Sequence, residues 1–349
     1  MTDRPAAAPA DDWRTRRDRL DAAGPTAHDF ARATEPGRGR EATLPTDLPP
    51  QGWQDIALRI FRAIPEDRIF ATAGGVAFFT LLAIFPAVAV VVSLYGIVAD
   101  ARTIGDHLAL LAGILPEGVL ALIRDQIATV ASKTTNTLSV AFAIAFGTAL
   151  WSANSGMVAL FDSLNVVYGE RETRSLVRLY ATTFGFTIGA IVFVLMAVGG
   201  LVVLPVALGL LGVPLPSNGV LLALRWPVLL ILVMLALSLV YRFGPSRRSA
   251  KWAWVTPGSV VSALLWIAGS WIFSWYVSNF DSYNRVYGSL GAGIGFMVWI
   301  WISAIIVLLG AVLNAEMEHQ TARDTTAGPD RPLGLRGATM ADHVGAAQS

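Results

Sequence analysis

The sequence predicts an all-α protein: a polytopic transmembrane bundle of six spans, with amphipathic interfacial helices and disordered termini. The chain of 349 residues is 54% hydrophobic and only 15% charged, with a mean hydropathy of +0.56. Ordinary globular chains carry about 25% charged residues. The hydrophobic residues are also gathered into long runs, and basic residues collect at alternating ends of these runs. Both patterns are typical of membrane proteins.

Six apolar stretches are long enough to span a bilayer core, which needs roughly 20 residues in a helix. They cover residues 71–98, 138–161, 180–205, 220–242, 254–277 and 289–314. Each is nearly free of charge and ends in charged or turn-forming residues. Lipid offers no partners to backbone polar groups, so runs of this length are predicted to be helices.

Lys and Arg near the span ends predict the orientation. One set of ends carries Arg59, Arg62, Arg68, Arg171, Arg174, Arg178, Arg242, Arg247, Arg248, Lys251 and Arg323. The opposite set carries only Arg102, Arg124, Lys133, Arg225 and Arg285. Because Lys and Arg are enriched on the cytoplasmic side, both termini are predicted to be cytoplasmic.

The two ends of the chain differ in composition from the middle. Residues 1–50 and 320–349 are poor in long apolar runs and rich in polar or small residues. Such segments bury too little apolar surface to offset their ordering entropy. We therefore expect two disordered cytoplasmic tails, at 1–50 and 320–349, flanking a six-helix domain at 51–319. Met1 is followed by polar residues, so no signal peptide is expected.

Two segments have amphipathic patterns. In residues 53–64, Trp53, Ile56, Ile60 and Ile64 fall on one helical face. This predicts either a helix on the inner membrane surface or a helix packed on the bundle. Residues 104–132 contain two short helical pieces and predict a cap over the outer mouth or a shallowly inserted segment.

The second span carries the most distinctive polar pattern. At 100° per residue, Trp151, Asn154, Ser155, Asp162 and Asn165 occupy about a quarter of the helix circumference. Polar groups in membrane helices normally face the bundle interior or a wet cavity. These residues are candidates for a polar path. The alternative is hydrogen bonding between helices together with a cap at the cytoplasmic end.

Other candidates lie in the first and sixth spans. Pro86 predicts a kink, since proline removes a helical hydrogen bond. Gly291 and Gly295 form G-x-x-x-G, a candidate packing seam or hinge. They do not complete a dinucleotide-binding G-x-G-x-x-G, because position 296 is Phe. A last group is a candidate cytoplasmic gate, or else simply meets water and nearby arginines: Asn314, Glu316 and Glu318.

Signals of soluble enzymes are missing from the sequence. The chain has no cysteine, its four histidines lack metal-ligand spacing, and it has neither a Walker loop nor a G-x-S-x-G elbow. The net charge of +1 gives no basic field for nucleic acid. We expect no catalytic residues, no metal, no cofactor and no nucleic-acid partner.

Three blocks of sequence carry a resemblance to a known family. They are "ATAGGVAFFTLLAIFPAVAVVVSLYG", "WSANSGMVALFDSLNVVYGERETRSLVR" and "VYGSLGAGIGFMVWIWISAIIVLLGAVLNAEMEH". In this order they resemble the YihY/BrkB family of bacterial inner-membrane proteins, historically labelled ribonuclease BN, over roughly residues 55–320. The resemblance implies a multi-pass protein of the bacterial inner membrane. It supplies no established catalytic residues.

Two functions are compatible with these features. The first is a non-enzymatic membrane protein that transports or accommodates a lipid-like or other amphipathic envelope component. The second is a membrane scaffold or assembly protein for envelope maintenance. Ribonuclease activity is disfavoured, because no acid, base or metal constellation is visible. Expected partners are membrane lipids, an amphipathic substrate and further copies of the chain packed through small-residue helix faces.

Overall fold

The computed structural model describes residues 24–98, 135–198, 220–279 and 291–348. Its helices are α2 (Ala27–Arg32), η1 (Pro45–Asp47), α3 (Pro50–Glu66), α4 (Ile69–Val98), α7 (Thr135–Val167), α8 (Leu176–Val198), α10 (Val220–Phe243), α11 (Trp252–Asn279), α13 (Gly291–Gln320) and α14 (Thr339–Asp342). The described part has no strand beyond an isolated bridge between Ala250 and Thr326. The predicted all-α class is confirmed.

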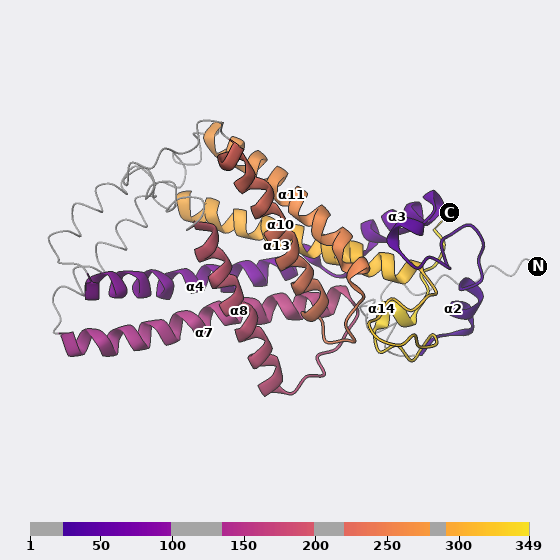
Figure 1. Cartoon of the computed structure of the whole chain (residues 1–349), viewed down its shortest axis with the longest axis horizontal. Helices are drawn as coiled ribbons and strands as arrows, with labels where there is room; N and C mark the ends of the chain where they lie inside the picture. Colours follow the sequence, from indigo (N-terminus) through magenta and orange to yellow (C-terminus); the bar gives the residue numbers. More distant parts are fainter. Residues whose placement is uncertain (1–23, 99–134, 199–219, 280–290, 349) are drawn as a thin grey trace, which may run out of the picture.

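The long helices α4 and α7 lie side by side and antiparallel (Figure 1). Their contact is close at Gly156 of α7, where a Cβ would lie 3.2 Å from the hydroxyl of Thr80 on α4. Buried Ala73 and Val76 of α4 share one apolar core with Leu164 of α7 and with residues of α13. Small residues therefore allow this pair of helices to pack along much of its length.

Helices α11 and α13 approach each other still more closely, around Gly258 and Gly310. A Cβ on Gly258 would collide with the carbonyl of Gly310, and one on Gly310 with the hydroxyl of Ser262. Ser262 donates to the carbonyl of Ile306 at 3.0 Å, and Trp266 Nε1 donates to Ser303 at 3.0 Å. Glycine and serine form this seam because larger side chains would separate the backbones.

The six-span topology is supported only in part. Among the described residues, three stretches are long and apolar enough to cross a membrane: Leu176–Phe193, Trp252–Tyr276 and Gly293–Gln320. The apolar stretches Ile69–Ala83 and Pro227–Phe243 are shorter. All six predicted spans coincide at least partly with helices, but six crossings are not confirmed. The predicted outer segment 104–132 lies outside the described residues.

The prediction of disordered tails is wrong for residues 24–50 and 320–348. Together with α3 and the loop 244–251 these segments form a folded body, here called the terminal cap, at one end of the helices (Figure 1). Arg40 is buried within it and donates to the carbonyls of Gln320 at 2.9 Å and Gly345 at 2.8 Å. The cap is held together mainly by polar contacts, which a criterion based on apolar surface does not detect.

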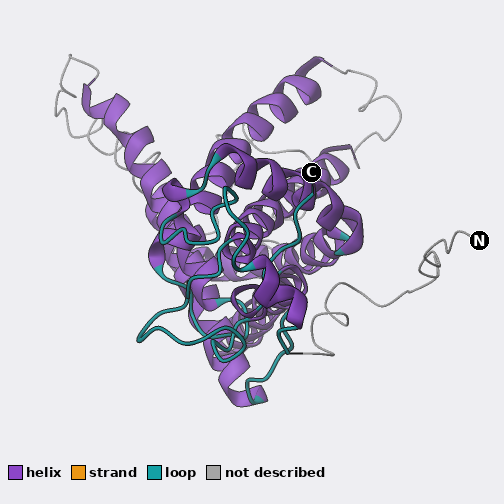
Figure 2. Ribbon diagram, turned by 90° about the vertical axis from the view of Figure 1, so that its right-hand side faces the viewer, coloured by secondary structure: helices purple, strands orange, loops and turns teal. Residues whose placement is uncertain are grey.

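Figure 2 views the molecule from the end that carries the terminal cap, where the loops gather over the helix ends. Several of these loops are joined by backbone hydrogen bonds. Lys251 N donates to the carbonyl of Thr325, and Ala327 N donates to that of Ser249, each at 2.8 Å. The cap therefore includes the connection between α10 and α11 as well as the two terminal segments.

Helix α3 packs on the bundle, which is one of the two placements predicted for it. Ile56 is buried, and Ile60 and Ile64 pack against the apolar core. Its polar face is covered too: Asp55 pairs with Arg38 at 2.7 Å. Phe61 remains 72% exposed. The helix is thus held between the bundle and the terminal segments.

Two predictions about hinge positions have different outcomes. A Cβ on Gly295 would meet nothing within 4 Å, so this glycine forms no packing seam within the described chain; the seam of α13 lies at Gly310 instead. The surroundings of Gly291 lie outside the described side chains. Helix α4 runs without interruption through position 86, while the Pro86 side chain also lies outside the described part. A kink there stays a prediction.

Candidate functional site

The two asparagines of the predicted polar path are buried and hydrogen-bonded. Asn165 Oδ1 accepts from the backbone N–H of Ser246 at 2.7 Å, and its Nδ2 donates to Glu172 at 3.1 Å. Asn154 Oδ1 accepts from Thr187 of α8 at 3.4 Å. These contacts join α7 to α8 and to two loops. They match the alternative interpretation, in which the polar groups bond helices together.

Trp151 lies on the outside of the helices and is 59% exposed. Its ring stacks on Tyr180 of α8, with centroids 5.8 Å apart and planes 18° apart, and it also contacts Phe184. Ser155 donates to the carbonyl of Trp151 at 3.0 Å. The five residues of the predicted path therefore have different surroundings within the described part of the chain.

Three of the five do line a cleft between α4, α7 and α8, here called the lateral cleft. Its volume is about 820 Å³. Its wall is formed by Arg68, Ala71, Thr72, Gly75, Phe79, Ser155, Val158, Ala159, Phe161, Asp162, Ser163, Asn165, Val166, Glu172, Leu179 and Tyr180. The cleft has apolar sides along the helices and charged groups at the end nearest the terminal cap.

Arg68 and Asp162 are the notable charged residues of the lateral cleft. Both side chains are exposed, and within the described part of the chain neither has a hydrogen-bond or ion-pair partner. Arg68 also has a φ of +49°, in the left-handed region that non-glycine residues rarely occupy. This strained conformation lies at the junction of α3 and α4, and strain of this kind is often found at functional sites.

The three residues of the predicted cytoplasmic gate all have polar partners in the structure. Asn314 accepts from the N–H of Gly258 at 2.8 Å and donates to the carbonyl of Val255 at 3.1 Å. It thereby bonds the backbone of α11 next to Pro257, where the helix ladder lacks a donor. Glu316 pairs with Arg59 of α3 at 2.6 Å.

Among the ion pairs described for the terminal cap, the one formed by Glu318 is the most deeply buried. Its two oxygens accept from both terminal nitrogens of Arg247 at 2.7 and 2.8 Å, and both side chains are fully buried. Thr325 donates to the same carboxylate at 2.9 Å, and the guanidinium lies 4.2 Å from the ring centre of Tyr168. These contacts attach the end of α13 to the loop after α10.

A second cavity lies between the start of α8, the end of α10 and the terminal cap, with a volume of about 700 Å³. It is here called the arginine pocket, because five arginines line it: Arg174, Arg178, Arg242, Arg247 and Arg248. From the sequence alone, these residues predict only the orientation in the membrane. In the sequence, Arg174 and Arg178 are four residues apart and Arg247 and Arg248 are adjacent, but neither spacing predicts that the two pairs meet. Only the folded structure shows that the five arginines lie around one cavity.

Glu170 also lines the arginine pocket. Burial raises the pKa of its carboxyl to about 7, against the partly compensating charge of Arg247 and a hydrogen bond from the N–H of Thr339 at 2.7 Å. A carboxyl group with this pKa changes charge near neutral pH. The net positive charge of the pocket therefore depends on pH in that range.

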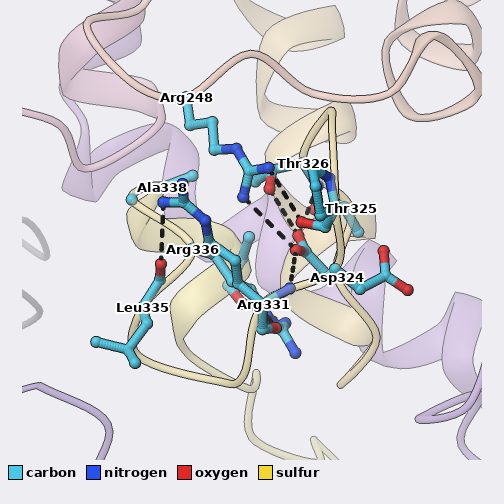
Figure 3. Close-up of polar contacts among 12 residues, drawn as sticks. Arg248, Asp324, Thr325, Thr326, Arg331, Leu335, Arg336 and Ala338 are labelled. Carbon is cyan, nitrogen blue, oxygen red and sulfur yellow. Dashed lines mark hydrogen bonds and ion pairs between the residues drawn. The ribbon is translucent and has the colours of Figure 1, made fainter.

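Figure 3 shows the polar contacts of Arg248 and the C-terminal loop, and of the residues it labels, Arg248 and Ala338 line the arginine pocket. Arg248 Nη1 lies 3.8 Å from Asp324 Oδ2. That carboxylate also accepts from the N–H groups of Arg331 at 2.7 Å and Thr326 at 2.8 Å. Arg336 donates to backbone carbonyls, among them that of Ala341 at 2.6 Å. The loop next to the pocket is thus densely hydrogen-bonded.

Comparison with known proteins identifies the family. The family model described as "Virulence factor BrkB" matches residues 60–333. The chain belongs to the virulence factor BrkB family. The match includes every described helix from α4 to α13 and both cavities' helical walls. Among the described residues of this BrkB-family protein, no group of three or more His, Asp or Glu side chains is placed to hold a metal ion.

Several relatives have printed names. The chain is 30% identical to "Putative ribonuclease-like protein YfkH" of Bacillus subtilis (strain 168) over 68% of its own length and 86% of that protein. It is 24% identical to "UPF0761 membrane protein AZOSEA40600" of Aromatoleum aromaticum, over 75% and 64% of the two chains. It is 34% identical to "UPF0761 membrane protein IL2447" of Idiomarina loihiensis over 27% and 33%. No solved structure matches. The BrkB-family chain is therefore a membrane protein.

Proposed function

We propose that this BrkB-family protein binds a lipid-like amphiphile of the cell envelope in the lateral cleft and assists its movement, without chemical conversion. The observation that carries the proposal is the combination of apolar walls with unpaired charges at one end of the cleft. In this proposal the protein lies in the bacterial inner membrane with both termini in the cytoplasm, where the positive-inside bias would put them.

The size and lining of the lateral cleft support an amphipathic ligand. Its volume of about 820 Å³ is in the range of small-molecule sites, which run from roughly 300 to 1,000 Å³. Ala71, Phe79, Val158 and Leu179 supply apolar surface for an acyl or prenyl chain. Ser155 and Thr72 add hydroxyl groups along the same walls.

The charged end of the lateral cleft supports a polar headgroup there. Arg68 and Asp162 both lack partners among the described side chains, so each is available to a ligand. Charged groups in contact with lipid are costly, and they normally mark a site or face water. A headgroup with an anionic oxygen would pair with Arg68, while a hydroxyl or ammonium group would pair with Asp162.

A matched pair of glycines tests the proposal. A Cβ on Gly74 or on Gly75 would meet no other atom within 4 Å, so at both positions a side chain can leave the backbone without a clash at its first carbon. Only Gly75 lines the lateral cleft. In proteoliposomes, Gly75→Phe should reduce the protein-dependent movement of a fluorescent phospholipid at least severalfold, while Gly74→Phe should leave it unchanged. Equal rates in both variants and the parent, or no protein-dependent movement at all, would contradict the proposal.

The chain also allows direct mapping of the bound lipid. Because the chain has no cysteine, a single cysteine can be introduced and labelled without first replacing any native cysteine. A photoactivatable label on Ser155→Cys should cross-link to lipid more than a label on Thr148→Cys, an exposed position of the same helix outside the cleft. Lipid adducts of equal yield at both positions would show that the cleft holds no preferred lipid.

The folded terminal cap favours a second candidate function, a membrane scaffold for envelope assembly. Leu58 and Phe61 of α3 are exposed apolar residues on the cap. A scaffold would use such a surface to bind a partner protein. Phe61→Ser should then abolish complementation of an envelope defect while lipid movement in proteoliposomes stays normal. The opposite result, with Gly75→Phe alone losing complementation, favours transport.

A further inference from the structure

The arginine pocket is lined by five arginines and by the carboxylates of Glu170 and Asp342, and three of the arginines are paired with further carboxylates. Arg174 pairs with Glu172 at 2.7 Å, and Arg247 pairs with Glu318. In contrast, the described structure gives no carboxylate partner to Arg178 or Arg242. The Arg178 side chain is exposed and has no hydrogen-bond or ion-pair partner of any kind among the described residues.

Unsatisfied N–H groups belong to the same arginines. Arg242 Nε, Arg247 Nε and Arg248 Nη1 are buried and lack a hydrogen-bond acceptor. A buried donor without an acceptor is costly, and native structures hold few of them. All three side chains line the arginine pocket, whose wall therefore carries more N–H donors than its own acceptors satisfy.

The remaining contacts hold two of the guanidinium groups, those of Arg242 and Arg174, in place. Arg242 donates to the carbonyl of Ala250 at 2.5 Å and lies 4.4 Å from the ring centre of Trp252. Arg174 donates to the carbonyl of Gly244 at 2.8 Å. Arginines held in position lose less entropy when an oxyanion binds, and their planar forks match phosphate oxygens.

We propose that the arginine pocket binds a phosphate-bearing anion, a phosphate monoester, diester or pyrophosphate group, with Arg178 and Arg242 as its principal ligands. This site is separate from the lateral cleft and does not depend on the proposed function. The phosphate group belongs either to a lipid headgroup or to a free anion. Exposed Leu176 and Val177 lie in the first turn of α8 beside the pocket, which gives a lipid chain apolar surface nearby.

The test uses the purified full-length chain in nanodiscs of phosphatidylcholine. Binding of inorganic pyrophosphate is measured by titration calorimetry, and retention of phosphatidic acid against phosphatidylcholine is measured by native mass spectrometry. Arg178→Gln should lower the affinity for whichever of the two ligands binds by on the order of tenfold, the effect expected for the loss of one charge-assisted contact. Arg178 has no partners to lose, so this variant should fold normally. Arg242→Gln should weaken binding similarly.

Arg323→Gln is the matched control, because Arg323 is an exposed arginine of the terminal cap that does not line the pocket. It should leave binding within about twofold of the parent. Binding of pyrophosphate alone supports the proposal with a free anion as the source, and preferential retention of phosphatidic acid supports it with a lipid as the source. The absence of both, or equal losses in Arg178→Gln and Arg323→Gln, would overturn it.

Discussion

At the scale of single residues, the buried ion pairs of the terminal cap give the most direct tests of the structure. Glu318 and Arg247 are both fully buried and joined by two hydrogen bonds. Removing one member of such a pair leaves the other charge buried without compensation. The attachment of α13 to the cap therefore depends on both residues being present.

Glu318→Ala should reduce the free energy of unfolding by about 3–5 kcal/mol, seen as a lower melting temperature in detergent. Asp330→Asn is the control, because the ion pair between Asp330 and Lys251 is exposed to solvent: the two side chains are 78% and 40% exposed. Exposed pairs contribute about 0–1 kcal/mol, so this variant should melt close to the parent. Similar losses in both variants would contradict the buried pairing of Glu318.

Glu170 predicts a pH dependence with a definite sign. The pKa of its carboxyl is about 7 in the folded chain and 4.5 ordinarily, so the folded state binds more protons between these values. Stability is therefore lost as the pH rises from about 4.5 to 7, by up to about 3 kcal/mol above 7. Arg247, Glu318 and the N–H of Thr339 are the groups that face this carboxyl and set its pKa.

Glu170→Gln removes this titration while retaining a hydrogen-bond acceptor for Thr339. The melting temperature of the variant minus that of the parent should increase between pH 5 and pH 8, and should be smallest at pH 5. A difference that is constant across this range would show that Glu170 is already ionised at pH 5.

At the scale of helices, the closest contact of the bundle is the Gly258–Gly310 seam of α11 and α13. A methyl group on Gly310 would collide with Ser262 and with the carbonyl of Gly258, whereas a methyl group on Gly295 would enter open space. Both glycines lie on the same helix, so helix propensity acts on both in the same direction. Only packing distinguishes them.

Gly310→Ala should destabilise the protein by about 1–3 kcal/mol through overpacking. Gly295→Ala should be neutral or stabilising by up to about 1 kcal/mol, because alanine is the better helix former. Thermal unfolding of the two variants in the same detergent provides the comparison. Greater destabilisation by Gly295→Ala would place the seam at the G-x-x-x-G pair, as sequence analysis first predicted.

The positions of the helices could be predicted from the sequence because each long helix coincides with an apolar run. The neighbours of each helix could not, since hydrophobic runs of similar composition do not specify their partners. For this reason G-x-x-x-G indicated a small-residue face at Gly295 but not whether another helix lies against it. Likewise, the polar arc on α7 was visible in sequence, yet only the fold shows that Asn165 is bonded to Ser246 and Asp162 is not paired.

At the scale of the whole molecule, the terminal cap joins parts of the chain that are far apart in sequence. Arg40 contacts the carbonyl of a residue 305 positions away, and Asp29 accepts from the N–H of Val344, 315 positions away. Local composition contains no information on such pairings. A criterion based on apolar content therefore could not predict that these segments fold. The arginine pocket was not predictable either, because part of its wall belongs to the terminal cap.

Arg40→Ala should loosen the cap, because the buried guanidinium bonds to both Gln320 and Gly345. Hydrogen exchange of residues 335–348 should become markedly faster in this variant, while exchange in α11 should stay near that of the parent. Arg323→Ala, which removes an exposed arginine, should change neither. Rapid exchange of 335–348 in the parent itself would contradict the folded cap.

The distance along the chain between α3 and the segment that covers it also constrains how the protein is made. Asp55 accepts from the N–H of Gln348, 293 residues later. At synthesis rates of about 5–20 residues per second, α3 emerges roughly 15–60 s before this partner. During that interval Asp55 and Arg59 lack their later partners, so in a newly made chain the end of the bundle that the terminal cap later covers is open to chaperones, lipids and proteases.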